Sequence, residues 1–415
     1  MSRNLVGNLI VCQSGGPTAV INSSLVGVID EALRHDEIKG VYGAVNGILG
    51  ILNLSIVDLS REDPSVIAGL RTTPSAGLGS CRYKLKEGDL GKILDIFEEY
   101  NVRYFFINGG NDSMDTGNRI LKFAQERKYA LRVMGIPKTV DNDLLHTDHC
   151  PGYGSAGRWL AIATMDAGKD TEGIYTADPI KIIETMGRNT GWLAATTVLA
   201  KQKEEEAPHL IYLPEVPFLL EKFPEDVQAV HKALGYAVIV VSEGIRGEDG
   251  KPLVESKRAT DMDSFGHRQP GGVGQYLANV IAENLNIKAR CDKPGTIQRS
   301  SMLCASSTDL QEAYLVGKMA VLYAVEGKSG YMVTLERVNS PQYQIKTGLV
   351  ELGKVANSTK EFPLEFITKD HNSVTPEFIK YFSPLLGGDL PSYVKLKKYP
   401  VAMPNSSGRS TGAEV

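Results

Sequence analysis

The chain has 415 residues, of which 42% are hydrophobic and 23% are charged, a mix typical of a soluble globular protein. At about 100–200 residues per domain, this length predicts two or three domains or one large α/β body. Because the net charge is −4, we expect no nucleic-acid partner held by phosphate neutralisation. The chain has no run of about 18 apolar residues, so we also expect no membrane span.

The N-terminal segment and the cysteines indicate a compartment. Residues 1–16 have too short an apolar core for a signal peptide and lack a small-residue cleavage site. The five cysteines are scattered and form no CxxC pair, which disfavours a disulfide framework and a structural zinc site. We therefore expect a cytoplasmic protein.

Apolar runs typical of strands alternate with longer amphipathic stretches along the chain. Strands are predicted over 8–12, 41–45, 103–108 and 131–136, and helices over 19–33, 90–100 and 114–127. The apolar runs 181–184, 193–199, 210–214 and 237–243 continue this rhythm. The alternation predicts an α/β fold with mainly parallel sheets, and ligands at the carboxyl ends of the strands. Residues 247–274 are predicted to form a surface excursion, and residues 404–415 a disordered tail.

Three of the predicted strands end in polar or glycine-rich segments. Ser14, Gly15 and Gly16 form either a plain turn or a loop that holds a phosphate. Residues 108–113 (NGGNDS) either cap the next helix or orient a metal-bound phosphate. Residues 136–143 (IPKTVDND) combine two carboxylates with a lysine. This set favours a base or metal ligand beside a cation for phosphoryl transfer over a plain Asx-rich turn.

Arginine and glutamate residues mark three later loops, at 184–188 (ETMGR), at Glu243, and at Arg290 with 296–300 (TIQRS). Each arginine alone is typical of a solvated surface charge. Together they suit a sugar phosphate, with arginine on the phosphate and glutamate on the hydroxyls. His146 and His149 lack metal-ligand spacing, and we expect a structural role for both.

The motifs SGG, GGNDS, PKTVDND, MGR, PEVPF, SEG and IQRS occur in this order. The ordered series closely resembles the phosphofructokinase family, and within it the branch that uses pyrophosphate. The resemblance implies two αβα lobes with the active site between them. The donor-binding lobe would comprise residues 1–153 and 298–345, and the sugar-phosphate lobe residues 154–297 and 346–403, including a C-terminal extension. The family reaction transfers a phosphoryl group to the 1-hydroxyl of fructose 6-phosphate. The resemblance also implies Mg²⁺ and a homo-oligomer of at least two subunits.

The resemblance further implies a role for each matching residue. Asp141 matches the proton acceptor, and Lys138 and Asp112 occupy the two positions that distinguish donors. Donor-binding positions fall on Gly15, Gly16, Arg82, Gly110 and Ser113. Sugar-binding positions fall on Thr139, Asp141, Met186, Gly187, Arg188, Glu243, Arg290, Thr296 and Arg299. The metal position falls on Asn111, which replaces an aspartate of the family, and either Asp112 or Asp143 is expected to compensate for the lost carboxylate.

Asp112 and Lys138 replace two glycines found in the members that use ATP. A carboxylate where the α-phosphate of ATP would lie adds bulk and like charge, which opposes a nucleotide. A lysine beside the transferring phosphates stabilises their charge. We therefore expect pyrophosphate as the donor and a reversible reaction.

Three other functions compete with this interpretation. One is an ATP-dependent phosphofructokinase with an unusual donor pocket. Another is a non-catalytic, phosphate-sensing regulatory subunit, which only Asn111 favours. A dinucleotide-binding oxidoreductase is disfavoured because the segment SGGPTAV lacks the GxGxxG spacing.

Overall fold

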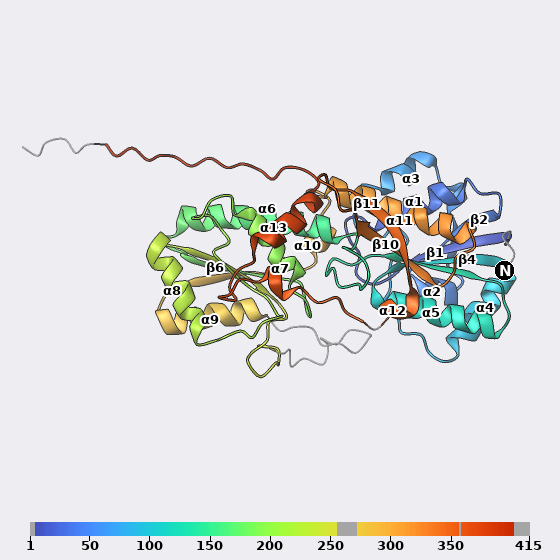
Figure 1. Ribbon diagram of the computed structural model, residues 1–415, viewed down its shortest axis with the longest axis horizontal. Helices are drawn as coiled ribbons and strands as arrows, with labels where there is room; N and C mark the ends of the chain where they lie inside the picture. The colour runs from blue at the N-terminus through green and yellow to red at the C-terminus, as the bar shows by residue number, and fades with distance from the viewer. Residues whose placement is uncertain (1–4, 255–271, 357, 402–415) are drawn as a thin grey trace, which may run out of the picture.

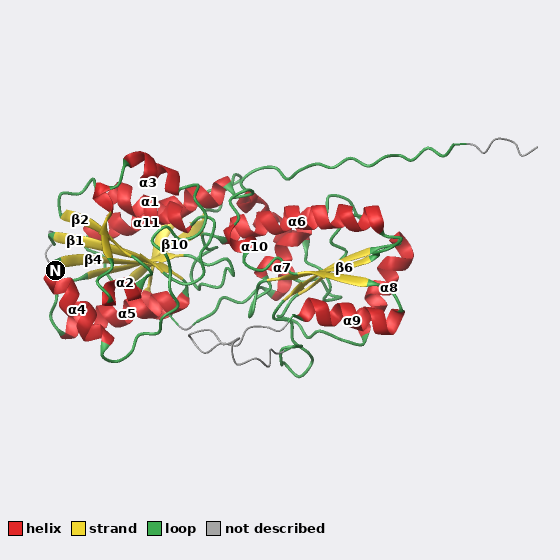
Figure 2. Ribbon diagram, turned by 180° about the vertical axis from the view of Figure 1, so that it is seen from behind, coloured by secondary structure: helices red, strands yellow, loops and turns green. Residues whose placement is uncertain are grey.

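The computed structural model describes residues 5–254, 272–356 and 358–401, which form two lobes side by side along the long axis of the molecule (Figure 1). The predicted α/β class is confirmed, because each lobe is a mainly parallel sheet between layers of helices (Figure 2). None of the described helices is long and apolar enough to cross a membrane.

The first lobe contains a seven-stranded sheet in the order β11-β10-β5-β4-β1-β2-β3. Its strands are β1 (Gly7–Gln13), β2 (Ile38–Ala44), β3 (Ile56–Asp58), β4 (Val102–Gly109), β5 (Arg132–Pro137), β10 (Tyr331–Arg337) and β11 (Ile345–Glu351). Its helices are α1 (Ile21–Ala32), α2 (Ile48–Leu52), α3 (Pro64–Leu70), α4 (Asp89–Glu99), α5 (Asn111–Glu126), α11 (Ser307–Val325) and α12 (Leu352–Val355). The five central strands pair in parallel, while β3 and β11 pair antiparallel at the two edges.

Strand β1 illustrates why these strands are continuous apolar runs. Leu9 and Val11 pack in the core on the side of α1 and α11, whereas Ile10 and Cys12 pack in the core on the side of α4 and α5. Successive side chains of a strand point to opposite faces, so a sheet covered on both faces needs apolar residues at every position. Figure 1 shows α1, α3 and α11 on one face and α2, α4 and α5 on the other.

The second lobe contains a four-stranded parallel sheet in the order β7-β8-β6-β9. Its strands are β6 (Ile180–Thr185), β7 (Leu210–Tyr212), β8 (Ala237–Ser242) and β9 (Ala289–Asp292), and its helices are α6 (Tyr153–Ile174), α7 (Trp192–Thr196), α8 (Lys222–Leu234), α9 (Val273–Leu285), α10 (Ile297–Ser300) and α13 (Pro376–Phe382). One face of the sheet packs against α6, α7 and α13, and the other against α8 and α9. The predicted run 193–199 is helical, because it lies in α7 and the 3₁₀ turn that follows.

The chain crosses between the lobes before α6, before α11 and after α12. The predicted boundary at 345 lies too early, because β11 pairs with β10 over seven residues and completes the first sheet. Residues 255–271 of the predicted surface excursion and the predicted disordered tail, 404–415, lie outside the described residues.

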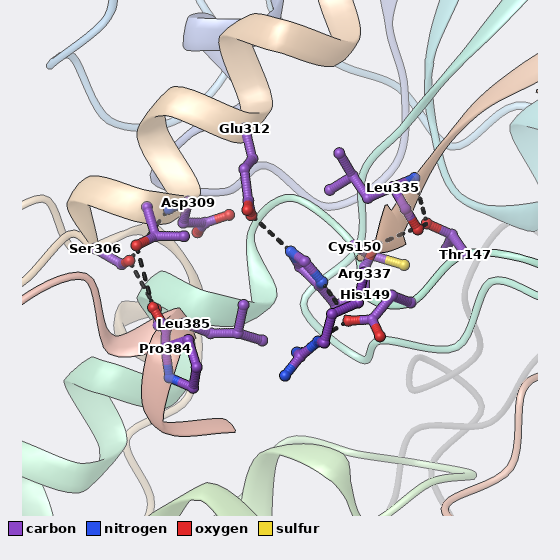
Figure 3. Close-up of polar contacts among 12 residues, drawn as sticks. Thr147, His149, Cys150, Ser306, Asp309, Glu312, Leu335, Arg337, Pro384 and Leu385 are labelled. Atoms are coloured by element: carbon purple, nitrogen blue, oxygen red, sulfur yellow. Dashed lines mark hydrogen bonds and ion pairs between the residues drawn. The ribbon is translucent and has the colours of Figure 1, made fainter. Parts of the chain in front are cut away.

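A charge network centred on the buried His149 joins α11 and β10 to the loop that follows β5 (Figure 3). The His149 ring contacts Asp148 Oδ1 at 2.8 Å and Glu312 Oε2 at 2.6 Å. Burial alone would lower the pKa of His149, but hydrogen bonds to the two carboxylates outweigh burial and raise the pKa to about 9. Arg337 adds a second cation, 3.1 Å from Asp148. His149 therefore acts as a structural cation between α11 and the loop that follows β5.

Candidate active site

A cavity of about 450 Å³ lies between the lobes, at the carboxyl ends of β1, β4 and β5 from one lobe and of β6 and β8 from the other. Most of the residues predicted for the site line this cavity. They are Gly15, Gly16, Arg82, Gly110, Asn111, Asp112, Ser113, Lys138, Thr139, Asp141, Asp143, Met186, Arg188, Glu243 and Arg299. The parallel sheets bring them together because strands of the same direction deliver their carboxyl ends to one edge.

The loop after β1 lies against two cations. The ammonium of Lys138 donates a hydrogen bond to the carbonyl oxygen of Gly16 at 2.9 Å. Gly15 has φ +79°, a left-handed conformation that favours glycine. A Cβ atom at Gly16 would lie 2.8 Å from Nη1 of Arg299. Glycine at position 16 therefore leaves room for the guanidinium of Arg299 beside the loop.

Three cations from different parts of the chain share this side of the cavity. Burial and the positive charges of Arg299 and Arg82 together lower the pKa of Lys138 to about 8, although Asp141 and Asp143 oppose the fall. Burial and Arg82 likewise lower the pKa of Arg299. The Nε atom of Arg299 is buried and has no hydrogen-bond partner in the structure. Such a cluster is costly unless a ligand with several negative charges neutralises it.

Helix α5 begins beside the strand end that carries Lys138, whose backbone N–H donates to the carbonyl of Gly109 at 3.1 Å. The loop that follows β4 provides Gly110 as the N-cap, and Asn111 and Asp112 open the helix. Oδ1 of Asn111 accepts a hydrogen bond from the backbone N–H of Asp112 at 2.9 Å, and Nδ2 of Asn111 donates to the carbonyl of Ser358 at 3.3 Å. The side chain of Asp112 is exposed to solvent at the cavity wall. The helix N-terminus adds backbone N–H groups that suit a phosphate.

Asp141 lies on the loop between β5 and α6, and its Oδ1 atom is buried without a hydrogen-bond partner. Burial, and then the charges of Asp143 and Glu243, raise the pKa of Asp141 to about 7, although Arg188 and Lys138 oppose the rise. The hydroxyl of Thr139 accepts a hydrogen bond from the backbone N–H of Asp141 at 3.2 Å. A carboxylate with this pKa and an unused oxygen is suited to accept a proton from a bound hydroxyl.

The second lobe supplies the opposite wall through the loops after β6 and β8. Gln298 accepts a hydrogen bond from the backbone N–H of Met186 at 3.0 Å, which joins the MGR segment to α10. Gly187 has φ +131°, and its carbonyl accepts a hydrogen bond from the Ser242 hydroxyl at 2.6 Å. Burial raises the pKa of Glu243. Gly187 thus shapes the loop without lining the cavity itself, while Met186, Arg188 and Glu243 line it.

Two predicted sugar-binding residues lie away from the cavity of their own chain. Arg290 sits early in β9, opposite Lys181 of β6, and its Nε atom is 2.8 Å from Asp178. Thr296 is exposed at the N-cap of α10. The pairing register explains the position of Arg290, because Lys181 lies near the start of β6 whereas the cavity lies at its end.

Three residues at or beside the cavity were not predicted from the sequence. Asn189 and Thr359 line it, and Lys360 contacts the loop that carries Asp141. Asn189 directly follows the MGR motif, and this position in the sequence could have predicted that it lies at the cavity. Thr359 and Lys360 belong to a segment without a recognisable motif, more than two hundred residues from Asp141. No local pattern could have placed them at the site.

The residues at the cavity fit a magnesium ion that arrives with phosphate ligands. Asp141 and Asp143 are close enough for their charges to raise the pKa of Asp141, and burial also raises the pKa of Asp143. A nearby divalent cation would relieve this repulsion. Among the described residues, no group of three or more His, Cys, Asp or Glu could hold a metal by itself. Mg²⁺ suits such a site because it commonly combines one or two carboxylates with water and phosphate oxygens.

Residues 8–323 match the family model described as phosphofructokinase. The chain is 42% identical over 411 residues to the pyrophosphate–fructose 6-phosphate 1-phosphotransferase of Xanthomonas campestris pv. campestris, covering 95% of this chain and 97% of that protein. The protein of the same name from Halomonas elongata is 39% identical over 409 residues, covering 95% of this chain and 97% of that protein.

A solved structure shows the same architecture over nearly the whole chain. It is the crystal structure of a pyrophosphate-dependent phosphofructokinase from Marinobacter aquaeolei, with a TM-score of 0.84 and 37% identity. The match covers 96% of this chain and 98% of that chain. The family resemblance drawn from the ordered motifs is thereby confirmed, and the chain belongs to the phosphofructokinase family.

Proposed function

We propose that the protein transfers a phosphoryl group reversibly from pyrophosphate to the 1-hydroxyl of fructose 6-phosphate, giving fructose 1,6-bisphosphate. One observation carries the proposal: Asp141, which has a buried oxygen without a hydrogen-bond partner, lines the same cavity as the cations Lys138, Arg82 and Arg299. The names of the relatives at 39–42% identity over 95% of the chain support the same reaction.

In the forward direction, Asp141 acts as the general base. It takes the proton from the 1-hydroxyl of the sugar as that oxygen attacks the nearer phosphorus atom of pyrophosphate. The bond from this phosphorus to the bridging oxygen breaks, and orthophosphate leaves. In the reverse direction the protonated Asp141 returns the proton. Its raised pKa of about 7 suits both roles near neutral pH.

The cations stabilise charge and position the donor. Lys138 is anchored on Gly16, so its ammonium is already placed beside the glycine loop when the donor arrives. Arg82 and Arg299 supply two further positive charges. Phosphoryl transfer depends mostly on positioning and on electrostatic stabilisation of the transferring oxygens, which is what three fixed cations provide.

On the sugar side, we propose that Arg188 and Arg299 contact phosphate or hydroxyl oxygens and that Glu243 accepts hydrogen bonds from sugar hydroxyls. Met186 completes this wall, and Gly187 shapes the loop that carries it. For Mg²⁺, we propose Asp143 and Asn111 as the protein ligands, together with oxygen atoms of pyrophosphate. The ion would neutralise charge on the phosphate oxygens when it is bound.

We further propose that the enzyme is a cytoplasmic homo-oligomer in which a neighbouring subunit supplies Arg290. This assignment is supported by the position of Arg290, which does not line the cavity of its own chain. Thr296 would lie at the same subunit contact, because it is exposed at the start of α10.

Phosphorus NMR tests the reaction directly. Purified protein is given Mg²⁺, pyrophosphate and fructose 6-phosphate, and we expect one orthophosphate and one fructose 1,6-bisphosphate to form for each pyrophosphate consumed. Fructose 1,6-bisphosphate and orthophosphate should regenerate the starting compounds. Pyrophosphate that stays intact, or that is hydrolysed without a sugar product, would refute the proposal and favour the regulatory-subunit alternative.

A further inference from the structure

The loop that carries Asp141 has little regular structure of its own. Residues 138–152 join β5 to α6 through turns and bends. Asn142, directly after Asp141, is fully buried and has φ +53°, a left-handed conformation that is unfavourable for most residues. Contacts from elsewhere in the fold must therefore hold this part of the loop in place.

Lys360 in the C-terminal extension makes several such contacts. Its Nζ atom donates to Oδ1 of Asn142 at 3.4 Å, to the carbonyl of Thr147 at 3.2 Å and to the carbonyl of Asp148 at 2.8 Å. Its backbone N–H donates to the carbonyl of Asp143 at 2.7 Å. An ammonium group has three N–H bonds, and all three serve this one loop.

The same lysine connects the loop to the second lobe. Its ammonium lies over the ring of Trp192, 5.0 Å from the centroid, and its carbonyl faces Nε1 of that indole at 3.5 Å. Trp192 opens α7 and packs in an aromatic cluster with Phe362 and Phe378. One side chain thus joins the catalytic loop, the C-terminal extension and the second lobe.

The three hydrogen bonds of the Lys360 ammonium go to neutral oxygens. Burial of a cation without a hydrogen-bonded carboxylate is unfavourable, and burial does lower the pKa of Lys360. A well-packed apolar residue would avoid that cost. The lysine instead links three acceptors of the loop to one another, the side chain of Asn142 and the carbonyl oxygens of Thr147 and Asp148.

We propose that Lys360 is a positioning residue for the phosphoryl-transfer reaction. It fixes residues 140–148 so that the carboxylate of Asp141 stays aligned with the hydroxyl of the bound sugar. Lys360 does not touch the reacting atoms and acts through the loop. The expected effect of Lys360 on turnover rests on the proposed function. The link between Lys360 and the loop can be measured without any substrate.

The experiment compares the wild-type protein with Lys360→Met, Lys360→Gln and the control Lys369→Met, which changes an exposed lysine of the same extension. Hydrogen–deuterium exchange without substrate should show faster exchange of residues 140–148 in both Lys360 variants. Turnover should fall about 10–100-fold, the effect of a misplaced group, while KM for pyrophosphate and for fructose 6-phosphate changes by less than about threefold. Lys369→Met should match the wild type.

A third variant separates positioning from simple loss of stability. In Lys360→Ala, added propylamine replaces the missing carbons and ammonium, and we expect it to restore part of the turnover. The proposal is overturned if exchange of the loop is unchanged, if turnover stays within twofold of the wild type, or if KM changes while turnover does not. It is also overturned if neither Lys360→Met nor Lys360→Gln folds, because Lys360 would then serve folding. Failure of the proposed function is distinguishable, since the wild type itself would then be inactive with pyrophosphate.

Discussion

The ammonium of Lys138 lies 2.9 Å from the carbonyl oxygen of Gly16 and donates a hydrogen bond to it, so the loop after β5 is joined to the loop after β1 at the donor side of the cavity. The contact uses one of three N–H bonds of the ammonium and leaves its charge beside the glycine loop. Because burial lowers its pKa to about 8, Lys138 remains mostly protonated at neutral pH and can still pair with phosphate oxygens.

Replacement of Lys138 by methionine removes this charge while keeping most of the volume. We expect kcat/KM for pyrophosphate to fall by about 10²–10³-fold, the usual effect of losing one preorganised stabilising group. Steady-state kinetics with varied pyrophosphate measures the change. Lys128→Met, at an exposed position of the same lobe, is the matched control. Wild-type kinetics in Lys138→Met would remove Lys138 from the donor site.

Asp141→Ser removes the proposed base and its negative charge. We expect turnover to fall by about 10²–10⁴-fold, with much smaller changes in KM, because general-base catalysis contributes an amount of this size. The measurement is the rate of fructose 1,6-bisphosphate formation at saturating substrates. Asp36→Ser, at an exposed position, controls for the substitution itself. Unchanged turnover in Asp141→Ser would show that another group accepts the proton.

The protonated state of His149 predicts how stability depends on pH. Its pKa is about 9 in the folded protein and 6.5 for an ordinary histidine, so the cation favours folding. The full contribution, on the order of 3 kcal/mol at about 1.4 kcal/mol per pKa unit, is present below pH 6.5 and is lost as the pH rises through 9. We expect the melting temperature to fall between these pH values in the wild type.

The variant His149→Gln isolates that effect. It should melt at a lower temperature than the wild type at pH 6.5, and the difference between the two proteins should shrink by pH 9.5. Differential scanning calorimetry across this range gives the comparison. A difference that stays constant with pH would mean that His149 is neutral in the folded protein, and that the contacts with Asp148 and Glu312 do not depend on its charge.

The position of Arg290 predicts a mixing experiment. If a neighbouring subunit supplies this arginine, Asp141→Ser and Arg290→Ala should each be nearly inactive alone. Subunits refolded together should recover up to about a quarter of wild-type activity, because half of the dimers are mixed and each has one intact site. Recovery is measured as fructose 1,6-bisphosphate formation per subunit. A mixture no more active than its components would show that a neighbouring subunit does not supply Arg290 to the site.

Much of the site was predictable because it follows the ends of parallel strands. Segments such as 14–16 and 139–143 carry chemistry in short contiguous runs, and sheet geometry brings the runs together. The edge strands β3 and β11 were not predicted. Each of them lies at an edge, with a partner on one side only, so the apolar signal there is weak.

Other features depend on contacts that no local pattern encodes. Lys360 reaches Asn142 across 218 positions of sequence, and only the return of the chain to the second lobe brings them together. Arg290 follows the family motif in sequence, yet the register of β9 against β6 directs it to Asp178. The resemblance predicts a sugar-binding role for Arg290, whereas the strand pairing places its side chain beside Asp178 and away from the cavity of its own chain.

Asp112 and Lys138 are the residues expected to select pyrophosphate over ATP as the donor. Replacing both of them tests that expectation. The double variant Asp112→Gly with Lys138→Gly restores the small residues of the members that use ATP. We expect it to lose pyrophosphate activity and to gain activity with ATP, because bulk and like charge no longer oppose the nucleotide. Activity assays with both donors follow the change, and a double variant that keeps the wild-type donor preference would assign specificity to other residues.

The most direct measurement is a comparison of donors in the unmodified protein, with kcat/KM determined for pyrophosphate and for ATP, each with Mg²⁺ and with the metal removed by a chelator. We predict turnover with pyrophosphate that requires Mg²⁺, and a kcat/KM for ATP lower by at least about 10²-fold. Efficient turnover with ATP and none with pyrophosphate would contradict the account.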